Sequence, residues 1–193
     1  MEMTVILGIL FLLVMGVAEF GYLLNQYITL VDGTREGARF GSSGKIDPYI
    51  RTTLPHTQNT AFPEAIDCII EGSHGYCPPG TISNGALEPI VLNPATDDIV
   101  ITFYRVANGQ IEATFGPWHR YNSGRTARVT TADVQRSIGS STLNSGVLVV
   151  EIFYSHGQLT KFPIFTSVIP DPIDVHTYTI MPLPLAKPTP VGQ

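Results

Sequence analysis

Side chains suited to catalysis are present in this sequence, but none stands at the spacing that a catalytic site requires. The five histidines share no metal-ligand spacing, and no H-E-x-x-H motif occurs. Gly44-Lys45 is followed by Ile46 and has Arg39 where a phosphate-binding loop needs glycine. The G-x-S-x-G motif of hydrolases is also missing. We therefore expect no catalytic residue, no resident metal or cofactor, and a function other than catalysis.

Two pairs of acidic residues offer oxygen ligands of the kind that Ca²⁺ binds. They are Asp97-Asp98 and the pair Asp171 and Asp174. Isolated acidic pairs in loops are more often solvated or cap a turn, so we expect no calcium site here.

An aromatic and basic cluster occupies one short segment, Trp118-His119-Arg120-Tyr121. The cluster could bind a sugar or a surface. Packing against a neighbouring subunit is the favoured alternative, so these four residues are expected to form a surface contact.

The two cysteines, Cys68 and Cys77, lie nine residues apart in a segment crowded with proline and glycine. Their even number and the lack of C-x-x-C spacing predict one disulfide across a small loop. Two reduced structural cysteines are the alternative. If the bridge forms, the domain matures outside the cytosol.

Glu19 is the one charged residue between Met3 and Val31. A carboxylate in an apolar helix is costly in lipid and commonly marks a functional site. Glu19 either is neutral near the headgroups or pairs with a cation on a neighbouring helix. Arg35 and Arg39 of its own helix lie about 24–30 Å further along the axis, so we expect its partner to come from another chain.

The apolar stretch that holds Glu19 predicts one helix from about residue 3 to about residue 40, because no proline interrupts it. Such a helix is about 55 Å long, nearly twice the roughly 30 Å hydrocarbon core of a bilayer. It must be surrounded by lipid or by protein, since it is apolar on every side. The stretch lacks the basic leader and cleavage site of a secretory signal. The acidic N-terminus and the distant arginines favour a processed chain whose basic leader has been removed.

The polar end of this helix carries two patterns that could direct assembly. Asp32 and Arg35, and likewise Glu36 and Arg39, are three residues apart and can pair along one face. A tandem G-x-x-x-G stripe, Gly33, Gly37 and Gly41, would let two helix backbones approach closely. The alternative is that these glycines only weaken the end of the helix.

The remaining sequence predicts an antiparallel sheet of four or five strands with one or two short helices. Two hairpins are expected: residues 99–106 with 110–115 around Asn108-Gly109, and residues 146–154 with 159–165 around His156-Gly157. A last strand is expected at 173–180. Short helices are expected at 63–71 and, after a capping box at Thr130, up to about Ile138. The fold class is α+β, with a helix at 1–41 and a domain at 42–193 that ends in a proline-rich tail.

The N-terminal residues resemble the TadE-like pseudopilins of tight-adherence pilus systems. The resemblance rests on the apolar run that ends in Glu19-Phe20-Gly21, followed by Arg35-Glu36-Gly37-Ala38-Arg39, and it covers about 40 residues. Glu2 stands seventeen positions before Glu19, which is the family's spacing between two acidic positions. In processed prepilins the acidic residue is usually fifth after the cut, so either residues precede Met1 in the mature chain or the processing differs.

This resemblance implies a structural subunit of an extracellular pilus. Identical subunits would pack through the hydrophobic helix, which would lie in the cytoplasmic membrane before assembly. A prepilin peptidase and a pilus assembly machinery would be further partners. Glu2 would pair with an α-amino group, its own or that of a neighbouring subunit. Glu2, Glu19, Gly33, Arg35, Glu36, Gly37 and Arg39 are the expected assembly residues.

The net charge of −5 and the pI near 5.4 argue against a nucleic-acid partner. The alternative to a filament subunit is a membrane-anchored adhesion or binding module that never polymerises.

Overall fold

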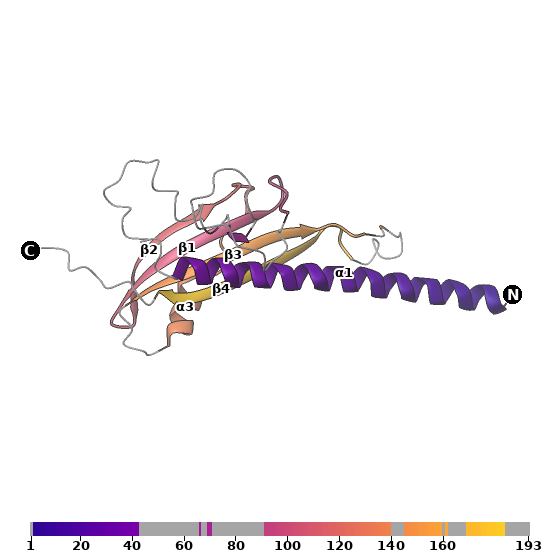
Figure 1. Ribbon diagram of the computed structural model, residues 1–193, viewed down its shortest axis with the longest axis horizontal. Coiled ribbons are helices and arrows are strands. Elements are labelled where there is room, and N and C mark those ends of the chain that lie inside the picture. Colours follow the sequence, from indigo (N-terminus) through magenta and orange to yellow (C-terminus); the bar gives the residue numbers. More distant parts are fainter. Residues whose placement is uncertain are drawn as a thin grey trace, which may run out of the picture.

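A computed structural model describes residues 2–42, 66, 69–70, 91–139, 145–159, 161 and 169–183. In this part of the chain a long helix lies against a four-stranded antiparallel sheet, and its N-terminal part projects beyond the sheet (Figure 1). The α+β class predicted from the sequence is confirmed. The boundary between the two predicted domains stays a prediction.

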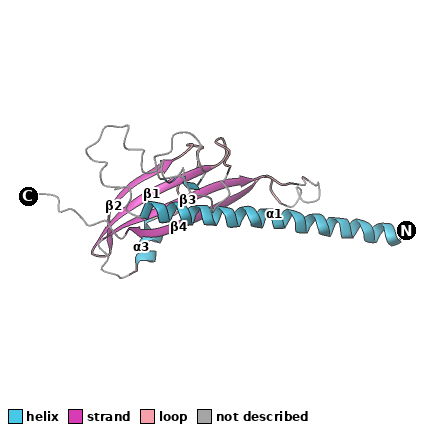
Figure 2. Cartoon of the chain, viewed as in Figure 1, coloured by secondary structure: helices cyan, strands magenta, loops and turns pink. Residues whose placement is uncertain are grey.

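Helix α1 runs from Glu2 to Ser42 without interruption, in agreement with the lack of proline in this stretch. Its C-terminal half packs on strands β4 and β3 (Figure 2). The buried positions there recur every three or four residues, as one face of a helix requires: Leu30, Gly33, Thr34, Gly37, Ala38, Gly41 and Ser42. The face is polar enough to bond across the interface, since Thr179 Oγ1 donates to Thr34 Oγ1 at 3.1 Å.

The sheet contains β1 (Asp98–Ala107), β2 (Gln110–His119), β3 (Ser145–His156) and β4 (Ile173–Leu183) in the order β2-β1-β3-β4. All three pairings are antiparallel. The two middle strands are the most apolar, and they supply most of the buried side chains.

Alternating residues of the middle strands fill two separate cores. On one face Leu148, Val150 and Ile152 pack with Phe103 and with Leu30 of α1. On the other face lie Tyr104, Val106, Val129, Val134, Val147 and Val149. The second core is covered by helix α3 (Thr131–Ile138). A sheet with both faces covered explains why β1 and β3 read as nearly continuous apolar runs.

Three local predictions are confirmed. β1 and β2 form the hairpin around Asn108-Gly109, whose φ angles of 52° and 73° suit a tight turn between twisted strands. α3 begins with the predicted capping box between Thr130 and Asp133. Three residues of the predicted helix at 63–71, Ile66, Ile69 and Ile70, are helical.

The second predicted hairpin is wrong. β3 pairs with β1 on one side and with β4 on the other, so neither edge is left for a hairpin partner. Of the predicted partner strand at 159–165, only Leu159 and Lys161 lie within the described residues. Gln158 instead ties the segment after β3 to the segment before β4. Its backbone N–H donates to Asp171 Oδ1 at 3.0 Å, and its side-chain amide donates to the Ile169 carbonyl at 3.1 Å.

Candidate functional site

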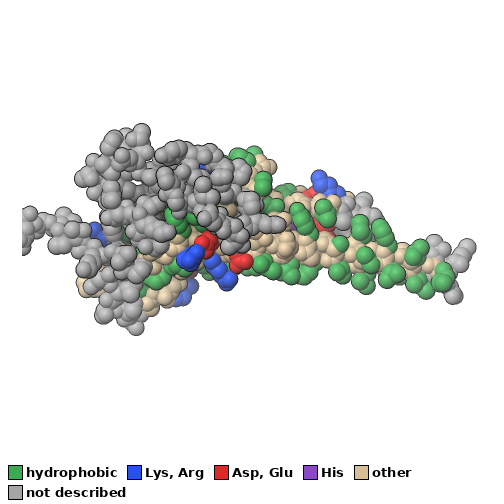
Figure 3. All heavy atoms as spheres, in the orientation of Figure 1, with side chains coloured by type: hydrophobic (Ala, Val, Ile, Leu, Met, Phe, Trp, Pro, Cys, Tyr) green, Lys and Arg blue, Asp and Glu red, His purple; other side chains and the backbone are tan. Residues whose placement is uncertain are grey.

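The N-terminal half of α1 exposes long apolar side chains along its length (Figure 3). The exposed fraction of these side chains runs from 55% at Phe11 to 82% at Met3, whereas Leu12 and Met15 are half-buried. By length and composition, the span Ile6–Ser42 could cross a membrane: its most apolar 18 residues have a mean hydropathy of 2.2, and none of them is buried in this chain. An apolar surface of this extent needs lipid or another protein to cover it.

Beyond Glu19 the helix runs beside the sheet, and only its outer side stays exposed. Phe20, Leu24 and Ile28 keep 66%, 46% and 52% of their surface, whereas Leu30 is 1% exposed. We call Phe20, Leu24 and Ile28 the outer stripe. It is a second apolar surface, continuous with the fully exposed half of the helix.

The glycines of the polar end pack against this chain's own domain. A Cβ atom added at Gly37 would lie 2.9 Å from Ile70 Cδ1 and 3.1 Å from Ile66 Cγ2, and Gly33 and Gly41 are buried on the same face. The stripe that the sequence offered for helix–helix packing therefore serves helix–domain packing. The physical reason is the same, because small residues let a helix backbone approach its neighbour closely.

The charged residues of the polar end pair with one another on the exposed side of α1. Arg39 Nε donates to Glu36 Oε2 at 2.9 Å, and Arg35 Nη1 lies 3.7 Å from Asp32 Oδ1. The side chains of Arg35 and Arg39 are 68% and 72% exposed. The i,i+3 pairing predicted from the sequence is confirmed, and both guanidinium groups remain accessible to a neighbour.

Glu19 has partners within its own chain. Its Oε1 accepts a hydrogen bond from the Leu159 backbone N–H at 2.8 Å and lies 4.0 Å from His156 Nε2. Its side chain is 14% exposed and that of His156 is 1% exposed. The Tyr22 ring lies 5.3 Å from the His156 ring, and burial raises the pKa of nearby Tyr154, which keeps that phenol neutral. Together Glu19, His156 and Leu159 form what we call the helix–sheet junction.

The prediction that the partner of Glu19 comes from another chain is wrong, because these contacts lie within one chain. It considered cations on α1, whereas the partners come from the end of β3, 140 residues further along the chain. β3 is long enough to carry His156 back to the level of Glu19. An apolar strand that ends in Ser155-His156 is the signal that could have indicated this contact.

The segment Trp118–Tyr121 is bound into the domain. Trp118 and Tyr121 pack against the core that faces α1, His119 Nδ1 lies 2.9 Å from Asp98 Oδ2, and the Arg120 guanidinium lies 5.5 Å from the Tyr121 ring centroid. All four residues are half-buried. Their contact with a neighbouring subunit stays a prediction.

The acidic pairs act as hydrogen-bond acceptors for nearby backbone groups. Asp97 accepts from the N–H groups of Asn93 and Ser155, both at 2.8 Å, and Asp98 accepts from Tyr121 N–H at 2.9 Å. Among the residues that the structure describes, no three histidine, cysteine, aspartate or glutamate side chains come together as metal ligands do.

Asp174 pairs with Arg125 at the start of β4. The 2.7 Å hydrogen bond from Arg125 Nη2 lowers the pKa of the Asp174 carboxyl and raises the pKa of the guanidinium. Arg125 also donates to Ser155 Oγ at 2.7 Å, so this pair links β4 to β3.

The sequence analysis did not identify one buried carboxylate, Glu151 in the middle of β3. It is fully buried, and its Oε2 accepts from the N–H groups of Arg128 and Val129 at 3.0 and 3.2 Å. His176 Nε2 lies 2.8 Å from the same oxygen. The signal was a single charge inside the apolar run of residues 147–154. These contacts attach the segment before α3 to the sheet.

Three predictions concern parts of the chain that the structure does not describe. Cys68, Cys77 and the proline-rich tail after Leu183 lie outside the described residues, and so does the side chain of Glu2. The disulfide and the pairing of Glu2 with an amino group stay predictions.

Comparison with known proteins gives one finding, and it concerns α1. A family model described as TadE-like protein matches residues 1–39, which include Glu19 and the segment Arg35–Arg39. This match confirms the family resemblance of the helix. No curated protein and no solved structure is significantly similar to the chain.

Proposed function

We propose that this chain, whose helix matches TadE-like proteins, is a structural subunit of an extracellular pilus of the tight-adherence type. Subunits polymerise through α1, and the globular domain stands on the outside of the filament. The role is structural, without catalysis and without a cofactor.

One observation carries this proposal: the apolar surface of α1 continues past the part that could be immersed in lipid. The outer stripe, Phe20, Leu24 and Ile28, lies beside the sheet, where a bilayer would be excluded by the domain itself. Only another protein can cover apolar groups there. A second copy of the same helix fits, because the exposed stripe is continuous with the apolar half.

Before assembly the same helix lies in the cytoplasmic membrane. Packing among like helices then replaces packing in lipid, which is why one segment must be apolar on all sides. A prepilin peptidase and the pilus assembly machinery act on the membrane-inserted subunit. Identical subunits are the partners in the filament, and nucleic acid is not a partner.

The exposed charges of α1 give the subunits a way to fix their axial register. Arg35 and Arg39 are accessible on the same side of the helix as the outer stripe's C-terminal end. In a staggered array, Glu2 meets the α-amino group of a neighbour, and these arginines lie next to carboxylates of another subunit. A slip along the axis would leave charges unpaired in an apolar core, at a cost of several kcal/mol.

Two variants of the full chain test polymerisation. Ile28→Glu places a charge in the outer stripe, where the side chain is 52% exposed, and Val91→Glu places the same charge at a β-branched residue that is 77% exposed and lies outside α1. Both variants should fold and enter the membrane, because neither side chain belongs to a core. Ile28→Glu should reduce the amount of filament in sheared surface material at least about tenfold, since a buried unpaired carboxylate is not tolerated.

The measurement is electron microscopy of the sheared material together with the intact mass of its subunit. Normal filaments from Ile28→Glu would contradict assembly through α1. Recovery of the unchanged chain only as detergent-solubilised monomers would favour a membrane-anchored module that does not polymerise.

A further inference from the structure

The helix leaves the domain at the helix–sheet junction. N-terminal to Glu19, α1 is apolar and most of its large side chains are exposed, with Leu12 and Met15 half-buried, whereas C-terminal to Glu19 the helix lies beside the sheet. The free part, residues 2–18, is about 26 Å long at 1.5 Å per residue. This is close to the roughly 30 Å hydrocarbon core of a bilayer. The junction therefore lies at the level where a membrane-inserted helix reaches the headgroups.

The two ends of the β3–β4 connection, which lie near the junction, are held in place by hydrogen bonds. Leu159 N–H donates to Glu19 Oε1, and Gln158 binds both the Ile169 carbonyl and the Asp171 carboxylate. Gln158 is itself 4% exposed. The ends of the β3–β4 connection are thus attached to the helix and to each other.

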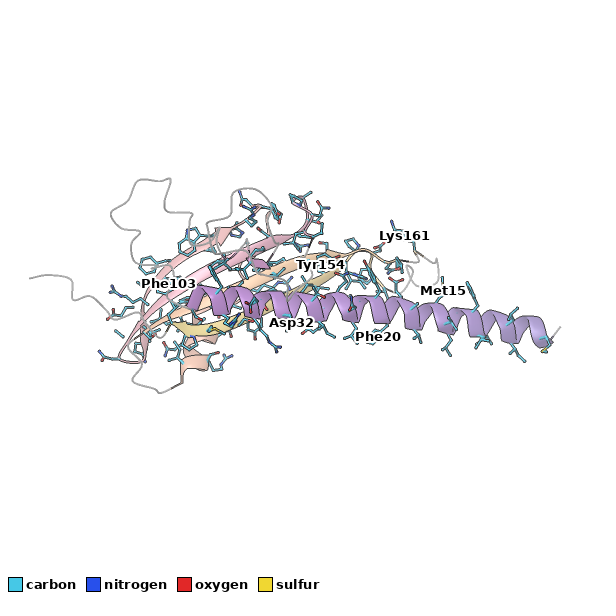
Figure 4. All side chains as sticks on the ribbon, in the orientation of Figure 1. Met15, Phe20, Asp32, Phe103, Tyr154 and Lys161 are labelled. Carbon is cyan, nitrogen blue, oxygen red and sulfur yellow. The ribbon has the colours of Figure 1, made fainter. Side chains whose placement is uncertain are left out.

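These attached ends present apolar side chains to the outside. Leu159 is 64% exposed and Ile169 is 41% exposed. Outside α1, the described part of the chain has only two other exposed large hydrophobic side chains, Val91 and Tyr178. Lys161, two residues after Leu159, is also exposed, and in the view of Figure 4 it falls between Met15 and Phe20 along the length of α1. Between Lys161 and Ile169 the sequence contains no charged residue.

An apolar pair with a lysine, placed where a helix reaches the headgroups, suits the interfacial region of a phospholipid bilayer. Leucine and isoleucine side chains gain from entering the boundary of the acyl chains. The lysine stem can lie along that boundary while its ammonium group remains among the phosphates. A second protein would have to approach through the membrane surface to cover the same residues before assembly.

We propose that Leu159, Lys161 and Ile169 form a membrane-contact surface that rests on the headgroups of the inserted subunit's bilayer. The Glu19–Leu159 hydrogen bond couples this surface to the helix and so sets the depth to which α1 is inserted. This inference rests on the proposed membrane-inserted stage. It adds a second point of lipid contact, made by the domain rather than by the helix.

Photo-crosslinking of the full chain in proteoliposomes of phosphatidylethanolamine and phosphatidylglycerol tests the proposal. Benzoylphenylalanine replaces Leu159 in one variant, Leu10 of the free helix in a second, and Gln110 in a third. Leu159 suits the test because its contact with Glu19 is made by the backbone N–H and survives the replacement. Gln110 is exposed at the β1–β2 turn, at the opposite end of the sheet.

The expected result is a lipid adduct, detected by mass, from positions 10 and 159 but not from position 110. A lipid adduct from position 10 together with none from position 159 would overturn this inference and leave membrane insertion intact. A protein–protein adduct from position 159 would also overturn it, in favour of a subunit contact. Loss of the lipid adduct at position 10 would instead contradict the membrane-inserted stage itself.

A second pair of variants probes the coupling through Glu19. Glu19→Leu removes the acceptor for Leu159 N–H, whereas Glu19→Gln keeps an oxygen at the same place. With benzoylphenylalanine at position 159, the yield of lipid adduct should fall at least about threefold in Glu19→Leu and remain near the parent's in Glu19→Gln. Equal yields in both would show that Glu19 does not position this surface.

Discussion

The two halves of α1 differ in the kind of side chain that meets their surroundings. From Met3 to Val17 the helix presents large apolar groups, and most of those that the structure describes are exposed. From Leu30 to Ser42 the inner face is mostly glycine, alanine, serine and threonine, and the sheet lies against it. Large groups suit an environment that can adapt to them, such as lipid or other helices. Small groups suit one fixed neighbour, because they let two backbones approach closely.

The helix–sheet junction separates these two halves. Glu19 is polar and partnered by the domain, and residues 3–18 contain no ionisable side chain. If the two halves act independently, a change in the C-terminal half should alter the stability of the fold. A matched change in the N-terminal half should alter filament assembly.

The largest contrast is expected from truncating one leucine in each half. Leu30→Ala removes a side chain that is 1% exposed and should lower the free energy of unfolding by about 2–5 kcal/mol. Leu13→Ala alters a side chain that is 58% exposed and should change the free energy of unfolding by less than about 0.5 kcal/mol. Denaturant unfolding of the full chain in detergent, followed by Trp118 fluorescence, measures both.

If filaments form through α1, the order reverses in an assembly assay, and Leu13→Ala should weaken the filament. Equal losses of stability in the two variants would mean that the N-terminal half is packed on the domain after all.

Replacing one glycine in each half should give a smaller contrast of the same kind. At Gly37 a Cβ already meets Ile70 and Ile66 within 3.1 Å, so Gly37→Leu should destabilise the domain by about 1–3 kcal/mol. At Gly8 a Cβ meets nothing within 4 Å, so Gly8→Leu should leave the melting temperature unchanged or raise it slightly. A melting temperature of Gly37→Leu equal to that of the parent would contradict close packing of this stripe.

The parts of the fold that the sequence predicts are those specified by neighbouring residues. The proline-free apolar run sets α1, Asn108-Gly109 sets the first hairpin, and Thr130 with Asp133 sets the start of α3. Each of these signals acts within a few residues. None needs knowledge of the rest of the chain.

The parts that could not be predicted depend on contacts between distant segments. The segment after β3 is apolar enough for a strand, but β4 occupies the edge where that strand would pair. Glu19 finds its partner 140 residues away, and the glycines that would suit packing on a second subunit's helix suit packing on this chain's own domain equally, as Gly37 does against Ile66 and Ile70. In each case the local pattern is real, but the segment that contacts it is determined by the order of the strands and cannot be found from neighbouring residues.

Changing Glu19 tests the boundary between the halves. Glu19→Leu leaves Leu159 N–H without its acceptor and should cost about 1 kcal/mol of stability. Glu19→Gln keeps an acceptor oxygen and should cost less. Hydrogen exchange at the Leu159 amide, measured by mass spectrometry of the full chain in detergent, should be faster in Glu19→Leu than in the parent. Equal exchange in the two proteins would mean that the bond is not formed in solution.

The smallest expected effect is the acid response, which should arise from Glu19 onward because residues 3–18 cannot titrate. Arg125 lowers the pKa of the Asp174 carboxyl below its ordinary value of 3.8. A carboxylate whose pKa is lowered on folding adds stability above the ordinary pKa, and this contribution is lost as the pH falls through the lowered value. The Asp174 side chain is 55% exposed, so the contribution should be at most about 1 kcal/mol. Asp174→Asn should therefore melt slightly below the parent at about pH 6, and the two proteins should converge below about pH 3. A difference that persists unchanged at the lower pH would show that the Arg125–Asp174 pair contributes through packing rather than charge.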